Sequence, residues 1–241
     1  MAEFLLYGRT DYNEILEFTA SLRAAAEKQE SARAVAFAAT VAGEAHLLAG
    51  NVDTAVSALE EGIELHRRIG ANAGESLSLQ RLAEAQLELG NHDRASQLLE
   101  EALPLARWSL LSHHLVQRIF GTMIRLADDP EAGLAVVQRA EREIGPADIC
   151  LFCTVMIAVP ATIACARAGE LDTARFHLML AEGSCESWPG TAWQGAVSEA
   201  KAHVALAEGF PDDAASLMVE AASLFERAGQ PLDVARCRAG I

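Results

Sequence analysis

Residues Gly90–Ala102 read GNHDRASQLLEEA and repeat the pattern of Gly50–Gly62, which reads GNVDTAVSALEEG. Seven of the thirteen aligned positions are identical. A glycine, an aspartate three residues later and then a periodic apolar run are typical of a turn that leads into a helix. Two such copies indicate a chain built from repeated helix–turn–helix units.

The same turn recurs along the whole chain. Its marker is a glycine, replaced once by alanine, and the markers are Gly8, Gly50, Gly90, Ala127, Gly169 and Gly209. Successive markers are 42, 40, 37, 42 and 40 residues apart. The repeat therefore keeps its phase from one end of the sequence to the other.

The choice of glycine and aspartate at these turns has a physical explanation. Glycine closes a helix because it adopts a left-handed backbone conformation without steric cost. An aspartate at the N-cap or in the first turn of the next helix accepts orphan N–H groups and faces the positive end of the helix dipole. The aspartates that suit this role are Asp53, Asp93, Asp172 and Asp213.

The residues after the turn favour close helix packing. A small residue follows at a fixed offset and lets the second helix of each pair approach the first: Ala55, Ala95, Ala132, Ala174 and Ala214. One helical turn later an apolar residue lies on the same face. These residues are Leu59, Leu99, Val136, Leu178 and Met218.

This pattern predicts a series of helix pairs. The predicted pairs are 32–49 with 53–69, 75–89 with 93–107, 111–126 with 130–143, 148–168 with 172–184, and 191–208 with 212–228. A partial helix ending near Gly8 and a helix at 11–29 precede them. A last helix begins near Pro231, since proline suits the first helical position.

The units resemble the tetratricopeptide (TPR) repeat. The small residue before the turn falls at Gly43 and Ala83, the turn glycine at Gly50 and Gly90, and the paired small residues at Ala55/Gly62 and Ala95/Ala102. The units depart from the TPR pattern in length, about 40 residues rather than 34, and lack its closing proline. The aromatic position of the first helix is held by His46, Gln86, Met123, Cys165 and Ala205.

The resemblance implies an all-α, right-handed solenoid of about five TPR-like helix pairs, with half-repeats at both ends of a single domain, 1–241. Longer units of this kind resemble the TPR region of large bacterial LuxR-type (MalT-like) transcription regulators. We therefore expect a non-catalytic sensing or interaction domain of such a regulator, in the cytoplasm. The alternative is a freestanding adaptor that assembles partner proteins. Because both ends interrupt a repeat, we expect a fragment of a longer chain, or self-association through the terminal repeats.

The amino-acid composition limits the kinds of partner that this segment can bind. The net charge of −15 opposes nucleic-acid binding by this segment, because neutralising phosphates requires a basic face. The expected partners are a protein, a peptide or a small-molecule effector. Residues 149–166 carry no charge over eighteen positions, the lower limit for a bilayer span, but they include Pro160 and keep the phase of the repeat. A buried helix is the better interpretation, and we expect no membrane contact.

The sequence contains none of the common catalytic motifs. A nucleophile elbow, a zinc-protease helix and a phosphate-binding P-loop are all missing, so we expect no enzyme and no cofactor. Cys150 and Cys153 form a C-x-x-C placed on the predicted helix 148–168, but a structural zinc site needs two such pairs. Core packing is favoured over thiol sensing and over a metal site.

A pair of histidines and the three tryptophans are each better explained by packing than by ligand binding. His113 and His114 point about 100° apart on a helix, so they cannot chelate one ion from a single face. We expect one of them to be exposed and the other half-buried. Trp108, Trp188 and Trp193 lie near loops between repeats, where we expect them to seal the packing of neighbouring units.

The first helix of each pair lines the inner groove of a TPR array, and the resemblance assigns a set of residues to it. They are Glu44, Gln80, Arg81, Glu84, Glu88, His114, Gln117, Arg118, Arg125, Met156, Ile163, Arg167, Glu199 and His203. The predicted ligand contacts among them are Arg81, Glu84, His114, Gln117, Arg118, Arg125, Met156, Arg167 and His203.

The four arginines of this set suit carboxylates and phosphates, because the guanidinium is a rigid fork of donors. The alternative is that they pair with Glu84, Glu88 or Glu199, or cover apolar surface with their stems. Pro160 is expected to free a backbone carbonyl inside its helix, which either opens part of a pocket or sets the curvature of the array.

Overall fold

The computed structural model describes residues 5–145, 150–188, 190 and 192–240, and these residues form α-helices and turns but no strand. The helices are α2 Tyr12–Lys28, α3 Ala32–Leu48, α4 Val52–Arg68, α5 Asn72–Glu88, α6 His92–Arg107, α7 Ser112–Leu126, α8 Pro130–Glu143, α9 Thr154–Arg167, α10 Leu171–Cys185, α11 Ala192–Ala207, α12 Pro211–Arg227 and α13 Pro231–Ala239. Consecutive helices pack on one another from α2 to α6 and from α8 to α13, as expected for a TPR-like solenoid.

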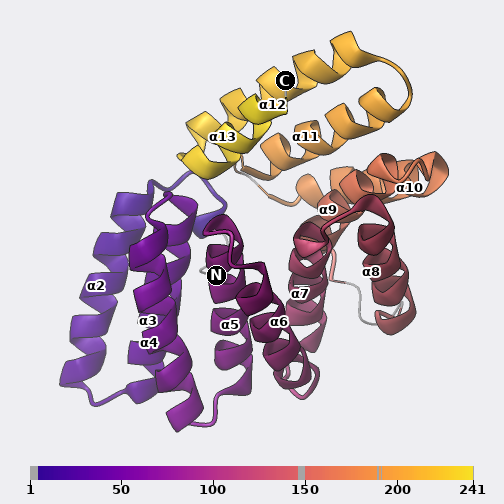
Figure 1. The fold of residues 1–241 in the computed structure, drawn as a ribbon. Helices are drawn as coiled ribbons and strands as arrows, with labels where there is room; N and C mark the ends of the chain where they lie inside the picture. Colours follow the sequence, from indigo (N-terminus) through magenta and orange to yellow (C-terminus); the bar gives the residue numbers. More distant parts are fainter. Residues whose placement is uncertain (1–4, 146–149, 189, 191, 241) are drawn as a thin grey trace. The chain divides into compact units, whose positions relative to one another are not determined.

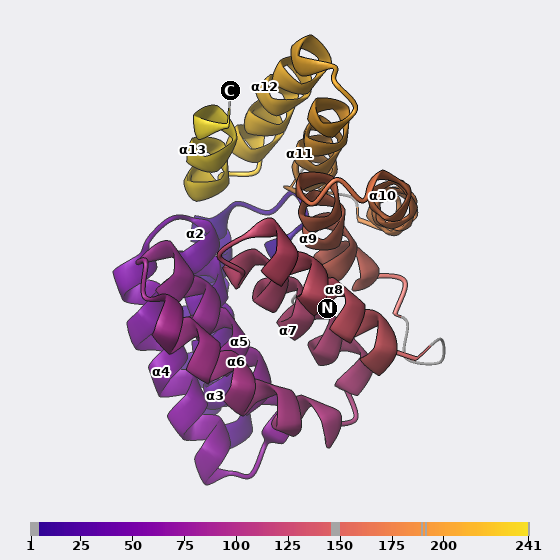
Figure 2. The same cartoon turned by 45° about the vertical axis from the view of Figure 1, so that its right-hand side comes forward.

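The chain divides into two compact units. Unit 1 comprises Met1–Leu6 and Thr10–Ile119, and unit 2 comprises Tyr7–Arg9 and Phe120–Ile241. In unit 1, α2 to α6 stack as consecutive helices, and α3 also contacts α5, the first helix of the next pair (Figure 1). In unit 2, α8 to α13 do the same, with a contact between α9 and α11 (Figure 2). First helices therefore meet first helices across repeats.

The predicted turn glycines are confirmed at four positions. Gly50, Gly90, Gly169 and Gly209 have φ values of 82°, 76°, 80° and 88°, which only glycine adopts readily. At the first of them the next residue, Asn51, donates its N–H to the carbonyl of His46 at 2.8 Å and so closes the helix end. The aspartates after the turns lie in the first helical turn rather than at the N-cap.

The small residue that admits close packing is always the fourth residue of its helix. Ala55, Ala95 and Ala174 are fully buried, as predicted. The prediction of Ala132 in this role is wrong, because Ala132 is exposed and Gly133 is buried in its place. The reason is that Asp129 caps α8 by accepting the Ala132 N–H at 2.8 Å, so the helix begins at Pro130 and its register moves by one residue. Val137, 1% exposed, correspondingly replaces Val136 in the core.

The start of α9 also differs from the prediction. The helix begins at Thr154 rather than near residue 148, and residues 146–149 lie outside the described part of the chain. Cys150 and Cys153 therefore do not share a helical face, because they flank a turn before α9. None of the described helices combines the length and the apolar character that crossing a membrane requires.

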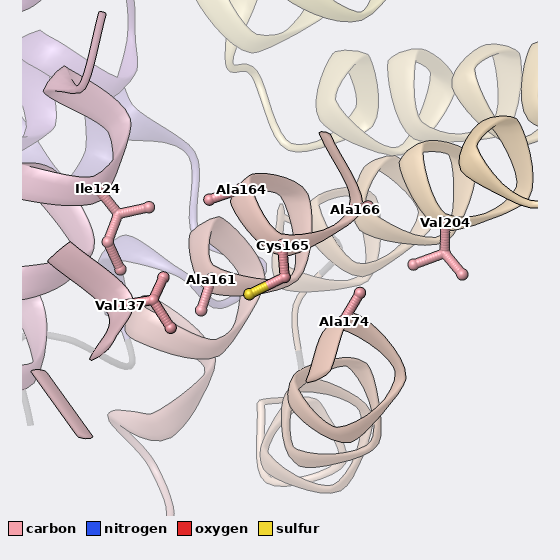
Figure 3. Close-up of a cluster of buried hydrophobic side chains, with 8 residues drawn as sticks. All are labelled: Ile124, Val137, Ala161, Ala164, Cys165, Ala166, Ala174 and Val204. Atoms are coloured by element: carbon pink, nitrogen blue, oxygen red, sulfur yellow. The ribbon is translucent and has the colours of Figure 1, made fainter. Parts of the chain in front are cut away.

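The core of unit 2 is built from small side chains. Figure 3 shows a cluster of buried side chains from α7 to α11 that includes Cys165: Ile124, Val137, Ala161, Ala164, Ala166, Ala174 and Val204. Cys165 has no exposed surface, and its burial, with Glu141 and Glu170 adding to the effect, raises the pKa of the thiol to about 11. Cys165 therefore packs in the core as a small apolar residue.

Candidate functional site

A buried ion cluster joins three first helices of unit 1. Glu44 on α3 is 2% exposed, and its Oε2 accepts a hydrogen bond from Arg81 Nε on α5 at 2.6 Å. Arg118 Nη2 on α7 donates to the same oxygen at 3.2 Å. Arg81 Nη1 also donates to Glu84 Oε2 at 2.5 Å. These ion pairs lie in surroundings where an unmatched charge would be costly.

The members of this cluster are spaced by one repeat. Glu44 and Arg81 are 37 residues apart, and Glu44 and Arg118 are 74 apart. Unit 2 contains a second pair at the same spacing, since Glu199 on α11 and Arg236 on α13 are also 37 residues apart. In each unit a glutamate on one first helix thus pairs with an arginine on another first helix and ties the two helices together.

The pair in unit 2 is bidentate. Arg236 Nε and Nη2 donate to Glu199 Oε1 and Oε2, both at 2.7 Å, and Arg236 Nη1 lies 2.6 Å from Asp233 Oδ1. Burial raises the pKa of Glu199, but the hydrogen bonds from Arg236 and the charges of Arg236, His203 and Arg125 outweigh it and leave that pKa below its ordinary value. Glu199 is therefore ionised at neutral pH.

His203 lies one helical turn after Glu199 and is half-buried. Burial is the largest cause that lowers its pKa; Glu199 opposes it, while Arg167 and Arg236 add to it. Arg125, Arg167, Glu199, His203 and Arg236 therefore share one electrostatic environment, although they come from α7, α9, α11 and α13. We call these five residues the unit 2 charge cluster.

The residues predicted to line a groove differ in accessibility. Arg81, Arg118, Gln117 and Met156 are buried, and Arg81 and Arg118 contribute to the ion cluster. Glu84 is 15% exposed, and His114 and His203 are half-buried. Arg125 and Arg167 are exposed, in the last turns of α7 and α9. Of the four predicted arginines, these two present a guanidinium to solvent.

The histidine pair and the tryptophans can also be compared with their predictions. His113 is exposed and His114 half-buried, as predicted. Trp188 is 4% exposed and donates its Nε1–H to the Phe152 carbonyl at 2.9 Å, consistent with a sealing role. The prediction for Trp108 is wrong, because this side chain is 86% exposed where α6 ends. The chain turns there before α7 begins, and the indole projects into solvent.

Sequence reasoning missed a polar node among α3, α4 and α5 in unit 1. Thr40 Oγ1 lies 3.1 Å from His66 Nε2 and 2.8 Å from Ser78 Oγ. His66 is 5% exposed, and its Nδ1 has no hydrogen-bond partner among the described residues. Gly74 makes room for the ring, since a Cβ at that position would lie 2.2 Å from His66 Cε1. No motif in the sequence signals this arrangement.

Because His66 is buried in this node, we predict that the protein loses stability in mild acid. Burial, with a smaller contribution from Arg33, lowers the pKa of His66 below its ordinary value near 6.5. The unfolded chain therefore binds a proton that the folded chain resists, so the free energy of unfolding falls as the pH drops below about 6.5. We expect a lower urea midpoint at pH 5.5 than at pH 7.5.

The variant His66→Gln isolates this contribution. Its urea midpoint is expected to change less between the two pH values, because the buried titrating group is gone. His92→Gln is the control, since His92 is exposed on α6. A pH dependence unchanged by His66→Gln would contradict the assignment.

Comparison with known families identifies the repeat. The tetratricopeptide repeat family model matches residues 35–107, which include α4, α5 and α6 together with most of α3. No curated protein matches the chain. Residues 35–107 are therefore similar to tetratricopeptide repeats, and the helical repeat of the chain is TPR-like, a fold that typically serves as a non-catalytic scaffold for protein interaction.

Proposed function

We propose that residues 1–241 form a non-catalytic interaction module that acts as the sensing domain of a cytoplasmic bacterial transcription regulator. The two units act as one functional domain, and a protein or peptide partner, or a small-molecule effector, binds along the first helices. The predicted contacts remain Arg81, Glu84, His114, Gln117, Arg118, Arg125, Met156, Arg167 and His203.

The observation that carries this proposal is the exposure of Arg125 and Arg167, two members of the unit 2 charge cluster, which is drawn from four helices. Arginine is enriched where proteins bind partners, because its planar fork orients a ligand and its stem packs on apolar surface. The buried members, such as Arg81 and Arg118, act by fixing the spacing of the first helices.

A site-specific photocrosslinker tests this surface in cells of the source organism. Placed at position 167, on a first helix, it should capture a partner protein in a discrete product. Placed at position 227, in the last turn of the second helix α12, it should not. Adding Arg125→Glu should remove the product at position 167 while circular dichroism shows unchanged helicity. Equal capture at both positions would refute the proposed surface.

The regulator role has a separate test. The reading frame around this segment should encode a helix-turn-helix DNA-binding domain or a P-loop ATPase domain. A frame that ends without either would favour the freestanding adaptor. Light scattering then measures self-association. The average molecular mass should rise with protein concentration only if the terminal repeats of one chain dock on those of another.

A further inference from the structure

We propose that Cys150 and Cys153 form a reversible thiol–disulfide site, which a low-molecular-weight disulfide such as glutathione disulfide oxidises. Both cysteines belong to unit 2 and lie on the turn before α9, and their Sγ atoms are within 4.8 Å of each other. Neither cysteine is among the contacts proposed for the partner, so this chemistry is independent of the proposed interaction function.

The turn places the two cysteines at a separation that a disulfide can bridge. Cys153 and Thr154 both donate their backbone N–H to the Cys150 carbonyl at 2.9 Å, and Thr154 Oγ1 donates to the same oxygen at 2.9 Å. The first and fourth residues of such a turn have Cα atoms less than about 7 Å apart, and disulfides join Cα atoms about 4.4–6.8 Å apart. Rotation of the side chains can therefore bring the two sulfurs to their bond length of about 2.05 Å while the turn stays folded.

Side chains from the end of α10 and beyond hold this turn in place. Ser184 Oγ donates to the Leu151 carbonyl, and Trp188 Nε1 donates to the Phe152 carbonyl at 2.9 Å. All three backbone carbonyls of residues 150–152 therefore accept hydrogen bonds. A turn fixed in this way keeps the two thiols close together, which raises the effective concentration of one thiol at the other.

The two thiols differ in their access to solvent, and this difference sets the order of the reaction. Cys150 is half-buried, whereas Cys153 is 4% exposed. The Cys150 thiolate therefore attacks glutathione disulfide first, forms a mixed disulfide and releases one glutathione. Cys153 then attacks the Cys150 sulfur and releases the second glutathione. Two protein thiols become one disulfide while the disulfide of the oxidant becomes two thiols, which take up the two protons.

The other three cysteines are poorer nucleophiles, because the thiolate is the reactive form. Cys165 and Cys237 have no exposed surface, and burial is the largest cause that raises the pKa of their thiols, to about 11 and about 12. Burial is also the largest cause that raises the pKa of Cys185. Oxidation by a small disulfide should therefore be confined to the pair on the turn.

The direct test compares the folded whole chain with the same chain unfolded by urea. Both equilibrate at pH 7.5 with mixtures of reduced and oxidised glutathione. Acid then stops the exchange, and alkylation with fragment-resolved mass spectrometry gives the fraction of the Cys150–Cys153 disulfide. The ratio of the squared reduced to the oxidised glutathione concentration at half oxidation should be about tenfold higher for the folded chain, because the turn holds the thiols together.

Single variants test the order of attack. Cys153→Ser should accumulate the mixed disulfide on Cys150, because the thiol that releases the second glutathione is gone. Cys150→Ser should react with glutathione disulfide about tenfold more slowly than Cys153→Ser, since the remaining thiol is buried. Cys185→Ser is the control and should form the Cys150–Cys153 disulfide as the unchanged chain does. Circular dichroism checks the helicity of each variant, and Cys153→Ala replaces Cys153→Ser if the serine unfolds the chain.

Three results would overturn the inference. The first is an equal or lower glutathione ratio at half oxidation for the folded chain than for the unfolded chain. The second is equal reaction rates of Cys150→Ser and Cys153→Ser, which would contradict the order of attack. The third is a disulfide that requires Cys185, or a mixed disulfide that persists in the unchanged chain.

Discussion

Replacing Glu44 with glutamine is expected to destabilise unit 1 by about 3–5 kcal/mol, the range for breaking a buried ion pair from one side. Glutamine has nearly the shape of glutamate, so packing changes little. The charge does change, because Arg81 and Arg118 both donate to the same Glu44 oxygen and both are only 4% exposed. The variant therefore removes the negative charge that both buried guanidinium groups contact.

The matched control is Glu61→Gln. Glu61 accepts two hydrogen bonds from Arg23, at 2.7 and 2.8 Å, but the two side chains are 42% and 39% exposed. An exposed pair contributes about 0–1 kcal/mol, so Glu61→Gln should change the urea midpoint only slightly. Equal losses in the two variants would show that Glu44 does not hold a costly buried charge balance.

A double-mutant cycle separates charge from shape. Adding Arg81→Met to Glu44→Gln removes one uncompensated guanidinium and keeps most of the volume of the side chain. The double variant should therefore lose less stability than the sum of the two single variants. Additive losses would mean that Glu44 and Arg81 act independently.

The sequence predicts most of this fold because each feature of the repeat acts on residues that are close to it in the sequence. A left-handed glycine, an acidic first turn and an apolar period each act within a few residues, so Gly50 and Gly90 locate their turns without tertiary information. Gly70 and Gly229 also have positive φ, at 65° and 73°, and close the second helices α4 and α12. The prediction did not use them as turn markers, because they lie between repeats rather than within the repeated motif.

The candidate site was less predictable, because burial depends on neighbours that are distant in sequence. The resemblance placed Arg81, Arg118, Arg125 and Arg167 together on the first helices. The spacing of 37 residues that joins Glu44 to Arg81 is visible in the sequence, but it does not show that the pair is buried. Arg125 and Arg167 differ from Arg81 by lying in the last turn of their helices, where side chains reach solvent.

The contact between α7 and α9 at Gly121 could not be read from the sequence either. Pro160 has no N–H to give the carbonyl of Met156, four residues earlier in α9. That carbonyl lies against Gly121, where a Cβ would come 2.1 Å from the Met156 oxygen. The freed carbonyl therefore packs closely against the backbone of helix α7.

Gly121→Ala is therefore expected to destabilise unit 2 by up to about 2 kcal/mol. Overpacking costs about 1–3 kcal/mol, and the higher helix propensity of alanine returns about 1 kcal/mol. The obstacle is backbone, which cannot rotate away as a flexible side chain would. Gly183→Ala is the matched control, because Gly183 lies in α10 with nothing within 4 Å of the place that a Cβ would occupy, and it should gain about 0.5–1 kcal/mol. The two variants make the same chemical change with opposite expected signs.

The emission of Trp188, which is buried in unit 2, follows this unfolding in urea. Pro160→Ala restores an N–H that draws the Met156 carbonyl back into α9, so it should recover part of the loss when combined with Gly121→Ala. The recovery requires that both residues act through that one carbonyl. A Gly121→Ala variant as stable as Gly183→Ala, or one that Pro160→Ala does not improve, would show that α7 and α9 do not meet at this point.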